Sequence, residues 1–585
     1  MSTVAITQWA PDVRRDWGSM TVDHSSVAEL RVLEGPNLYF PRAAVKLTLD
    51  LASVLEVSES DALRLAARIG LRNVRPGAAG SGFRQRFAAR AVARLVRQIA
   101  AEAGTHRLAL RVRTTADVHQ IVVAYPWRRR GRAEALGRAV GYVLDSLPRA
   151  EVEAVVSEAA DRVRSAEEGD PPRTIRPRVP VVAVTGTNGK TTTSRMIAHM
   201  ARCAGLHVGW SSTDGIYVDG TLVEPGDYSG PSGAGRVLAQ PGIEFAVTET
   251  ARGGILLRGI GVTSNDVSVV TNVSADHLGM QGIDTVDQLA EVKAVVARIT
   301  KPGGWAVLNA QDPRVLAMRS VIKARPWVFS RDPDAPGVRE VLGESGRATT
   351  IIDGWISVLD PGSDPNPLQA VVDVPMTLSG LSHFNVENAL AAASAGLAAG
   401  LEIAAVVRGL TSFEPGPELN PGRMNIYSLG DVTVVIDLAH NEAGLDALLE
   451  IISGLCPPVG RRLLVLGTAG DRTDDIVRGL GEAGARGSDV VVVAHKLDYM
   501  RGRSVPEMTE LYREGARLVG VEDVPSYDTE LQALQALMAE SRPHDVVAVM
   551  CHQDRPLVEE WLRIQGATAD DAPTIRRKVL AAGVS

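Results

Sequence analysis

The sequence predicts an α/β protein built around a phosphate-binding domain, with a small α+β domain before it and a second α/β domain after it. Three observations support this. A buried strand, a glycine-rich loop and a helix succeed one another in residues 181–204. Short apolar runs then alternate with helical patterns up to residue 414. The same alternation returns in residues 415–585, as is typical of parallel sheets covered by helices.

The small α+β domain is predicted at residues 1–165. Its apolar residues either alternate with polar ones, as in half-buried strands, or recur every four residues, as in amphipathic helices. These patterns predict strands at 29–33, 108–112 and 121–125, and helices at 83–101 and 133–147. No catalytic group of residues is visible here, so a docking or scaffold role is the simplest interpretation.

Residues 166–180 predict a linker, because four prolines among many charged residues cannot build a core. The central domain is expected at 181–414 and the C-terminal domain at 415–585. Each predicted strand of these domains is a short apolar run, as expected for parallel strands. The central strands are expected at 181–184, 245–250, 267–272 and 305–309, with a helix at 285–299, and the C-terminal strands at 432–436, 463–466, 490–493 and 546–550.

Composition narrows the functional class. With 45% hydrophobic and 22% charged residues, the chain has the content of an ordinary globular protein, and a net charge of −7 argues against nucleic acid as a partner. The three cysteines lie far apart, which predicts a reducing compartment. No signal-like N-terminus is visible, and no apolar run approaches the roughly 18 residues of a membrane span. We therefore expect a cytoplasmic protein without a membrane partner.

The loop Thr185-Gly-Thr-Asn-Gly-Lys-Thr-Thr192 predicts the nucleotide site. Gly186 and Gly189 let the backbone turn tightly and approach an anion, and the following helix N-terminus faces the phosphates. Lys190 is expected at the terminal phosphates and the Thr191 hydroxyl on Mg²⁺. The general phosphate-loop pattern has a glycine where this chain has Val184, so the match is to a variant.

Further candidates fall at the ends of predicted strands, where ligands bind in such sheets. Glu249 ends one strand, and Asp276 and His277 follow another. Magnesium–nucleotide chemistry needs oxygen or imidazole ligands, so Thr191, Glu249 and His277 are the metal candidates. Lys293 lies in a predicted helix. Three alternatives stay open for it: a solvated surface lysine, a cation near the γ-phosphate, or a lysine carbamylated by CO₂ that binds a second Mg²⁺.

Several motifs together resemble the Mur ligase family. They are the phosphate loop, Thr271-Asn-Val-Ser-Ala-Asp-His277, Phe384-Asn-Val-Glu-Asn388 and Asp437-Leu-Ala-His440. Within that family the chain is most similar to cyanophycin synthetase, through Gly226-Asp-Tyr-Ser-Gly-Pro-Ser232, Glu249-Thr-Ala-Arg-Gly-Gly-Ile255 and, in the N-terminal domain, Glu34-Gly-Pro-Asn37 with Arg42 and Lys46. The ATP-grasp domain of that enzyme has no counterpart here, because the linker leads directly into the Mur-like part.

The resemblance implies roles for matching positions. The loop residues Gly186, Thr187, Asn188, Gly189, Lys190, Thr191 and Thr192 would bind ATP, together with Asn385, Asn388, Arg423, Asp437 and His440. Thr191, Glu249, His277 and Lys293 would hold the metal, and Lys293 matches a lysine that is carbamylated in several members. No diaminopimelate-specificity motif is visible. Asp498 and Arg501-Gly-Arg503 could contact the amine substrate, although a charged surface turn explains them equally well.

The implied reaction is ATP-dependent amide formation. Phosphorylation converts a carboxylate into an acyl phosphate, which an amino acid or peptide amine attacks, releasing ADP and phosphate. Arginine joined to an aspartyl side chain is the first expectation. Two alternatives remain: polymerisation of preformed dipeptides or natural-product peptide ligation, and an inactive ATP-binding scaffold. The oligomeric state is open, with a homo-oligomer among the alternatives.

Overall fold

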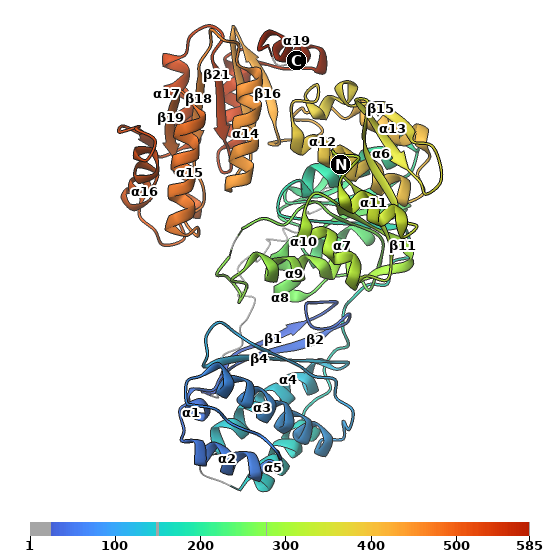
Figure 1. The fold of residues 1–585 in the computed structure, drawn as a ribbon, viewed down its shortest axis with the longest axis vertical. Helices are drawn as coiled ribbons and strands as arrows, with labels where there is room; N and C mark the ends of the chain where they lie inside the picture. Colours follow the sequence, from blue (N-terminus) through green and yellow to red (C-terminus); the bar gives the residue numbers. More distant parts are fainter. Residues whose placement is uncertain (1–24, 148–150, 277, 584–585) are drawn as a thin grey trace, which may run out of the picture. The chain divides into compact units, whose positions relative to one another are not determined.

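The computed structural model describes residues 25–147, 151–276 and 278–583. These residues fold into two compact units that divide between Thr174 and Ile175, and the short segment Leu256–Gly259 belongs to the first unit. Figure 1 shows the elements of each unit, coloured along the chain.

The first unit is a four-stranded antiparallel sheet in the order β1-β2-β4-β3, with helices gathered on one side (Figure 1). Its elements are β1 (Val27–Leu33), β2 (Ala44–Asp50), α1 (Ala52–Leu55), α2 (Glu59–Arg68), α3 (Gly82–Glu102), β3 (Arg111–Thr114), β4 (Gln120–Pro126), α4 (Arg130–Ser146) and α5 (Val152–Ser165). The strands expected at 29–33 and 121–125 and both expected helices are confirmed.

The prediction of a strand at 108–112 is wrong for residues 108–110. Only β3, from Arg111 onward, pairs with β4. Leu108, Leu110 and Val112 all pack against the hydrophobic core of the unit, so their alternation reflects burial rather than strand pairing. Residues 166–180 contain no helix or strand. The domain boundaries at 165, 180 and 414 stay predictions.

The second unit begins with an eleven-stranded sheet whose centre is parallel. Seven strands, in the order β13-β12-β11-β10-β5-β9-β6, form this parallel centre, and antiparallel pairs extend it at both edges. The expected doubly wound parallel centre is therefore confirmed, whereas the sequence patterns did not predict the antiparallel strands at its edges. The strands are β5 (Val181–Thr185), β6 (Val208–Ser211), β7 (Gly215–Val218), β8 (Thr221–Pro225), β9 (Phe245–Glu249), β10 (Asn265–Val270), β11 (Thr300–Asn309), β12 (Arg325–Phe329), β13 (Arg347–Ile352), β14 (Trp355–Leu359) and β15 (Asn366–Ala370).

Helices cover both faces of this sheet because alternate residues of the central strand point to opposite sides. Val182 and Val184 of β5 share a core with α6 and α12, whereas Val181 packs with Val237 of α7. The helical elements of this part are α6 (Lys190–Cys203), α7 (Pro231–Leu238), α8 (Arg252–Arg258), α9 (Val286–Arg298), α10 (Pro313–Ala317), α11 (Pro336–Gly343), α12 (His383–Ala398), α13 (Ile403–Ser412) and the 3₁₀ turns η1 (Met318–Val321), η2 (Val371–Asp373) and η3 (Pro375–Thr377).

The rest of the unit is a seven-stranded sheet in the order β20-β19-β18-β21-β17-β16-β22. The four predicted strands form its parallel centre. Its elements are β16 (Asn425–Leu429), β17 (Val432–Asp437), α14 (Glu442–Leu455), β18 (Arg462–Leu466), α15 (Asp474–Gly487), β19 (Val490–Ala494), η4 (Leu497–Tyr499), α16 (Val505–Arg517), β20 (Ser526–Tyr527), α17 (Glu530–Glu540), β21 (Val546–Met550), α18 (Arg555–Ile564), β22 (Thr568–Ala569) and α19 (Ala572–Ala581).

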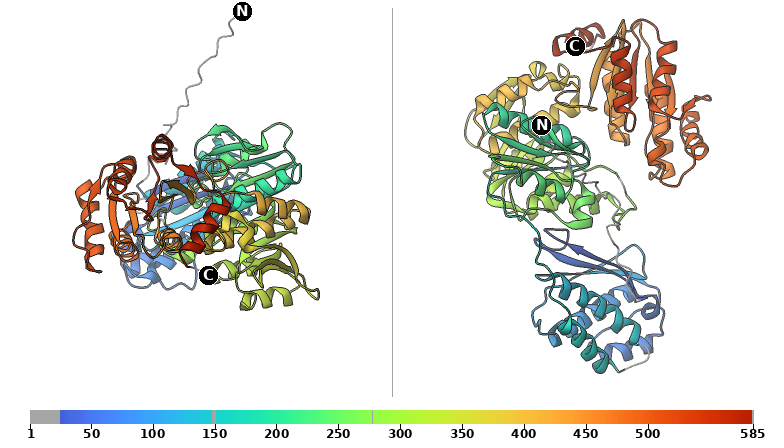
Figure 2. Two further views of the ribbon diagram at one scale, coloured as in Figure 1. Left: turned by 90° about the horizontal axis from the view of Figure 1, so that it is seen from above. Right: turned by 180° about the vertical axis from the view of Figure 1, so that it is seen from behind.

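The two faces of this second sheet are covered by different helices. Leu464 and Leu466 of β18 share a core with α14, α15 and α16, whereas Leu463 and Val465 share another with α17 and α18. Figure 2 shows the sheet, in orange to red, between these layers. The parallel strands therefore end at one edge, where their loops can build a site.

Candidate active site

The glycine-rich loop joins β5 to α6, and two of its glycines are required by their surroundings. A side chain at Gly186 would overlap the Thr271 hydroxyl, and one at Gly189 would overlap the Asn388 side chain. Gly189 also has a φ of +83°, a conformation that other residues rarely adopt. The two glycines therefore permit close packing with β10 and α12 as well as a tight turn.

The residues after β10 hold the loop in place. The amides of Thr187 and Asn188 donate to the backbone and side-chain oxygens of Asn272, both at 2.9 Å. The Thr271 hydroxyl donates to the Asn188 carbonyl at 2.6 Å. Lys190 Nζ donates to the Thr187 carbonyl at 2.7 Å and so curls over its own loop. The predicted motif at 271–277 thus begins by shaping the phosphate loop.

Glu249 meets this loop from the end of β9. Thr191 Oγ1 donates to Glu249 Oε2 at 2.9 Å. Oε1 of Glu249 is enclosed and has no hydrogen-bond partner among the described residues, although the residue is only 1% exposed. Burial raises the pKa of Glu249, and Lys190 and Thr191 oppose this shift. An enclosed carboxylate oxygen without a donor is costly unless a cation joins it.

Lys293 reaches the loop from α9. It is 3% exposed, and its Nζ donates to the Gly186 carbonyl at 2.6 Å. Burial, followed by the nearby charge of Lys190, lowers the pKa of Lys293 well below its ordinary value. The solvated alternative for Lys293 is therefore wrong. His277 lies outside the described residues, so its predicted place on the metal stays a prediction.

A cavity of about 120 Å³ joins most of the predicted nucleotide contacts. The predicted residues that line it are Thr187, Asn188, Gly189, Lys190, Thr191, Thr192, Asn385, Asn388, Arg423, Asp437 and His440. Asn388 Nδ2 donates to Asn385 Oδ1 at 3.1 Å, and the Thr193 hydroxyl donates to Asn388 Oδ1 at 3.2 Å. Residues far apart in the chain, from the phosphate loop to the loop after β17, therefore surround one space.

The end of β17 and the loop after it contribute two half-buried titratable groups, Asp437 and His440, to the cavity. Burial raises the pKa of Asp437 to about 6, and the positive charge of Arg423 opposes this shift. Burial lowers the pKa of His440 to about 4, which keeps its imidazole neutral near pH 7. His440 Nδ1 donates to the Leu438 carbonyl at 3.0 Å, so Nε2 is left as the acceptor.

The structure adds residues that the sequence did not single out. Asn441 caps α14 through Gly444 and exchanges side-chain hydrogen bonds with Asn188, at 3.1 and 3.4 Å. Asparagine ahead of a helical pattern is a capping signal that could have identified it. Arg195 gave no such signal, because arginines on helices are normally solvated. It is 3% exposed and binds Asp214 and Asn420.

The residues expected to contact the amine substrate, Asp498, Arg501 and Arg503, have different surroundings. Arg503 Nη2 donates to the Arg472 carbonyl at 2.9 Å, and Arg503 also forms ion pairs with Asp474 and Glu507. Asp498 and Arg501 are exposed. Arg472 is itself paired with Asp276 at 3.2 Å.

Two features are absent from the described residues. They contain no group of three or more His, Cys, Asp and Glu side chains placed to share a metal ion. None of their helices has the length and apolar character that crossing a membrane requires.

Comparisons with known proteins identify both parts of the second unit. The family model "Mur ligase middle domain" matches residues 184–396, and "Mur ligase, glutamate ligase domain" matches residues 422–552. Together they cover more than half of the chain.

Two relatives and one solved structure are similar to this chain. The cyanophycin synthetase of Crocosphaera subtropica is 41% identical over 360 residues, which are 62% of this chain and 40% of the relative. The diaminopimelate ligase of Corynebacterium efficiens, "UDP-N-acetylmuramoyl-L-alanyl-D-glutamate--2,6-diaminopimelate ligase", is 27% identical over 76% of this chain and 85% of its own. The structure "E.coli FolC in complex with DHPP and ADP" is 22% identical, with a TM-score of 0.49, over 67% of this chain and 90% of that one.

The chain spans about two fifths of the length of the cyanophycin synthetases that it matches. It nevertheless contains both domains that the family models describe, in the family's order, with the phosphate loop in the first and Asp437 and His440 in the second. The chain therefore belongs to the Mur ligase family.

Proposed function

We propose that this chain is an ATP-dependent amide ligase. It transfers the γ-phosphoryl group of ATP to a carboxylate and joins the resulting acyl phosphate to an amino acid or peptide amine, releasing ADP and phosphate. One observation supports this most strongly. The Thr191 hydroxyl and the buried, half-satisfied carboxylate of Glu249 meet beside the phosphate loop.

The residues present fit a magnesium ion. A threonine hydroxyl and a carboxylate are oxygen donors of the kind that Mg²⁺ prefers, and the enclosed Oε1 of Glu249 needs a cation. Thr191 and Glu249 would hold the ion, with His277 and Lys293 as the further predicted ligands. When bound, Mg²⁺ would neutralise the charge that develops on the phosphates.

The chain's own residues supply positioning and positive charge, which are most of what phosphoryl transfer requires. The amides at the N-terminus of α6 face the phosphates, and Lys190 can turn from the Thr187 carbonyl to the γ-phosphate. The acyl phosphate has phosphate as its leaving group, whereas an unactivated carboxylate would have to lose oxide. Asn385, Asn388, Arg423, Asp437 and His440 would bind the nucleoside and shield the intermediate from water.

Lys293 suits carbamylation because only a neutral amine attacks CO₂. Burial favours the neutral amine, and carbamylation would place a carboxylate beside the Gly186 carbonyl. Intact-protein mass spectrometry under bicarbonate should show the addition of one CO₂, and the Lys293→Arg variant should not. An unmodified wild-type mass in bicarbonate would contradict carbamylation and leave the role of Lys293 near the γ-phosphate as the remaining alternative.

The first substrates to test are arginine and an aspartyl side chain, following the similarity to cyanophycin synthetase. The experiment measures nucleotide products with aspartate-containing tripeptides and a panel of amines. We expect ADP and phosphate, with ¹⁸O from the labelled carboxylate appearing in the phosphate. AMP and pyrophosphate would rule out the acyl-phosphate route.

The matched variants are Lys190→Ala and Lys323→Ala, because Lys323 is an exposed lysine outside the cavity. Lys190→Ala should lower turnover by about 10²–10³-fold, as loss of a charge-stabilising group does, and Lys323→Ala should not. Unchanged cellular function of the Lys190→Ala variant would favour an ATP-binding scaffold instead.

A further inference from the structure

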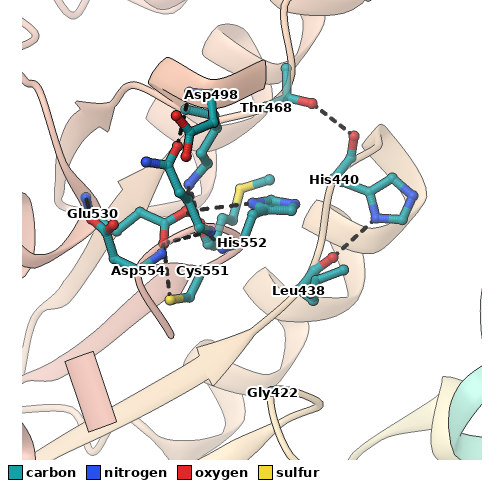
Figure 3. Close-up of polar contacts among 12 residues, drawn as sticks. Gly422, Leu438, His440, Thr468, Asp498, Glu530, Cys551, His552 and Asp554 are labelled. Atoms are coloured by element: carbon teal, nitrogen blue, oxygen red, sulfur yellow. Dashed lines mark hydrogen bonds and ion pairs between the residues drawn. The ribbon is translucent and has the colours of Figure 1, made fainter. Parts of the chain in front are cut away.

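The turn of residues 551–554, which follows β21, is organised by one buried carboxylate. Glu530, the first residue of α17, is fully buried. It accepts hydrogen bonds from the amides of His552 at 2.7 Å and Asp554 at 2.7 Å, and from the Gln553 amide with both oxygens. It also accepts one from the Cys551 thiol at 3.1 Å. Figure 3 shows these contacts converging on Glu530. The turn is thus shaped around this side chain.

Lys496 completes the arrangement from the loop after β19. It is 1% exposed, forms an ion pair with Glu530, and donates to the Met550 carbonyl at 2.6 Å. It therefore ties Glu530 to the end of β21. Apolar residues can often replace a buried ion pair without loss of stability. Stability alone consequently does not explain this pair, and the geometry that it imposes on the turn needs another reason.

His552 is the residue that this geometry places. Both of its ring nitrogens are enclosed: Nδ1 lies 3.8 Å from Glu530 Oε1, beyond hydrogen-bond distance, and Nε2 has no hydrogen-bond partner among the described residues. Its ring meets that of His440 edge-on, with 6.1 Å between centroids (Figure 3), and His440 lines the nucleotide cavity. His495, a buried histidine of the same domain, is instead paired with the Thr509 hydroxyl at 3.0 Å. With Nδ1 facing Glu530, Nε2 is the atom that calls for a partner, and the described residues do not supply one.

We propose that Glu530 and Lys496 are positioning residues of the ligase site, which hold the 551–554 turn so that His552 contacts the incoming amine beside His440. This rests on the proposed function. A neutral imidazole offers one acceptor and one donor, and the acceptor nitrogen can receive a hydrogen bond from the amino group. Burial lowers the pKa of the His552 imidazole to about 3, so this acceptor is present at neutral pH.

The positioning role can be tested without any substrate. Diethylpyrocarbonate modifies accessible, neutral imidazoles, and mass spectrometry of peptides locates the modified residues. In the wild type His552, whose ring nitrogens are enclosed, should react about tenfold more slowly than His207, which is half-exposed. The Glu530→Gln/Lys496→Met double variant removes both charges together, but the amide nitrogen of the introduced glutamine cannot accept hydrogen bonds from the turn. His552 should then react nearly as fast as His207.

Kinetics test the contact with the amine. With Mg-ATP, an aspartate-containing tripeptide and arginine as the amine probe, His552→Gln and the double variant should raise the KM for arginine about tenfold, the effect of losing one hydrogen bond. The KM for ATP should change less than about twofold. The controls are His207→Gln and Asp570→Asn/Lys578→Met, which removes a second acid–lysine pair of the same domain, joined at 2.5 Å.

The outcomes separate the two proposals. Fast labelling of wild-type His552, or unchanged labelling in the double variant, would overturn the positioning role whether or not the protein turns over. If the double variant does not fold, His552→Gln decides through the KM for arginine, and an unchanged value would overturn the contact. A wild type that releases no ADP with any amine refutes the ligase function, while the labelling result still decides the positioning role.

Discussion

Glu249 and Glu530 are both buried and both lie near a lysine, but their surroundings differ. Glu249 receives one hydrogen bond, from Thr191, and its second oxygen has no partner among the described residues. Glu530 is paired with Lys496 and accepts bonds from three backbone amides and a thiol. Burial raises the pKa of both, but at Glu530 the charge of Lys496 and the hydrogen bonds more than offset this and hold its pKa well below the ordinary value.

The difference separates a binding group from a structural one. A satisfied carboxylate stabilises the geometry around it, whereas an unsatisfied one costs free energy until a ligand arrives. The lysines follow the same division. Lys496 has a carboxylate partner, while Lys293 donates to the uncharged Gly186 carbonyl and has a lowered pKa. Incomplete satisfaction therefore marks the phosphate-loop site, and complete satisfaction marks the support of the His552 turn.

The largest expected effect is on Glu530. Glu530→Gln leaves Lys496 charged and buried without its anion, which should lower the free energy of unfolding by about 3–5 kcal/mol. Because the folded pKa of Glu530 is lowered, its contribution exists above the ordinary carboxyl pKa and disappears as the pH falls through the folded value. Denaturant unfolding at pH 7 and at pH 4 should show a smaller difference from wild type at pH 4.

Glu249→Gln should have the opposite sign in stability. The folded pKa of Glu249 is raised, so its favourable contribution exists below the ordinary carboxyl pKa and is lost as the pH rises through the folded value. In metal-free buffer at pH 8 the variant should unfold at a higher temperature than wild type. It should also lose about 10²-fold or more of ADP release, and the stabilisation by Mg-ATP. A lower melting temperature would mean that Glu249 is satisfied in the free protein.

The smallest effect is expected at Lys293, with Lys496 as its comparison. Lys293→Met removes one hydrogen bond to the Gly186 carbonyl but also a buried polar group, so the free energy of unfolding should change by less than about 1.5 kcal/mol. Lys496→Met should cost clearly more, because it strands a buried carboxylate. Chemical denaturation of both variants side by side measures the difference. Equal losses would contradict the division drawn between the two sites.

Local patterns in the sequence predicted much of the fold. Between Val181 and Thr191 the signals of a strand, a loop and a helix start follow one another within a few residues. The central strands of the C-terminal sheet were likewise predicted from short local runs of apolar residues. Predictions failed where a pattern had two causes. Leu108 and Leu110 alternate because they touch the core, without pairing as a strand. The antiparallel edges depend on which strands meet, which periodicity does not report.

The residues of the site also divide into those that the sequence predicted and those that it did not. Lys190, Thr191 and Glu249 could be predicted because each sits on a recognisable turn or strand end. Nothing local distinguished Lys496 or Glu530 from solvated surface residues, since 34 positions separate them and each needs the other to be buried. The same is true of Arg195 with Asn420 and of His552 with His440.

The sequence alone therefore determined the phosphate loop and those strands and helices that have a clear local pattern, because hydrophobic period and glycine placement act over neighbouring residues. Only the tertiary structure decided which charged and polar side chains are buried, which are paired and which are left unsatisfied. Burial and pairing depend on contacts between distant elements, and the free energy of a buried charge depends on all of its neighbours at once.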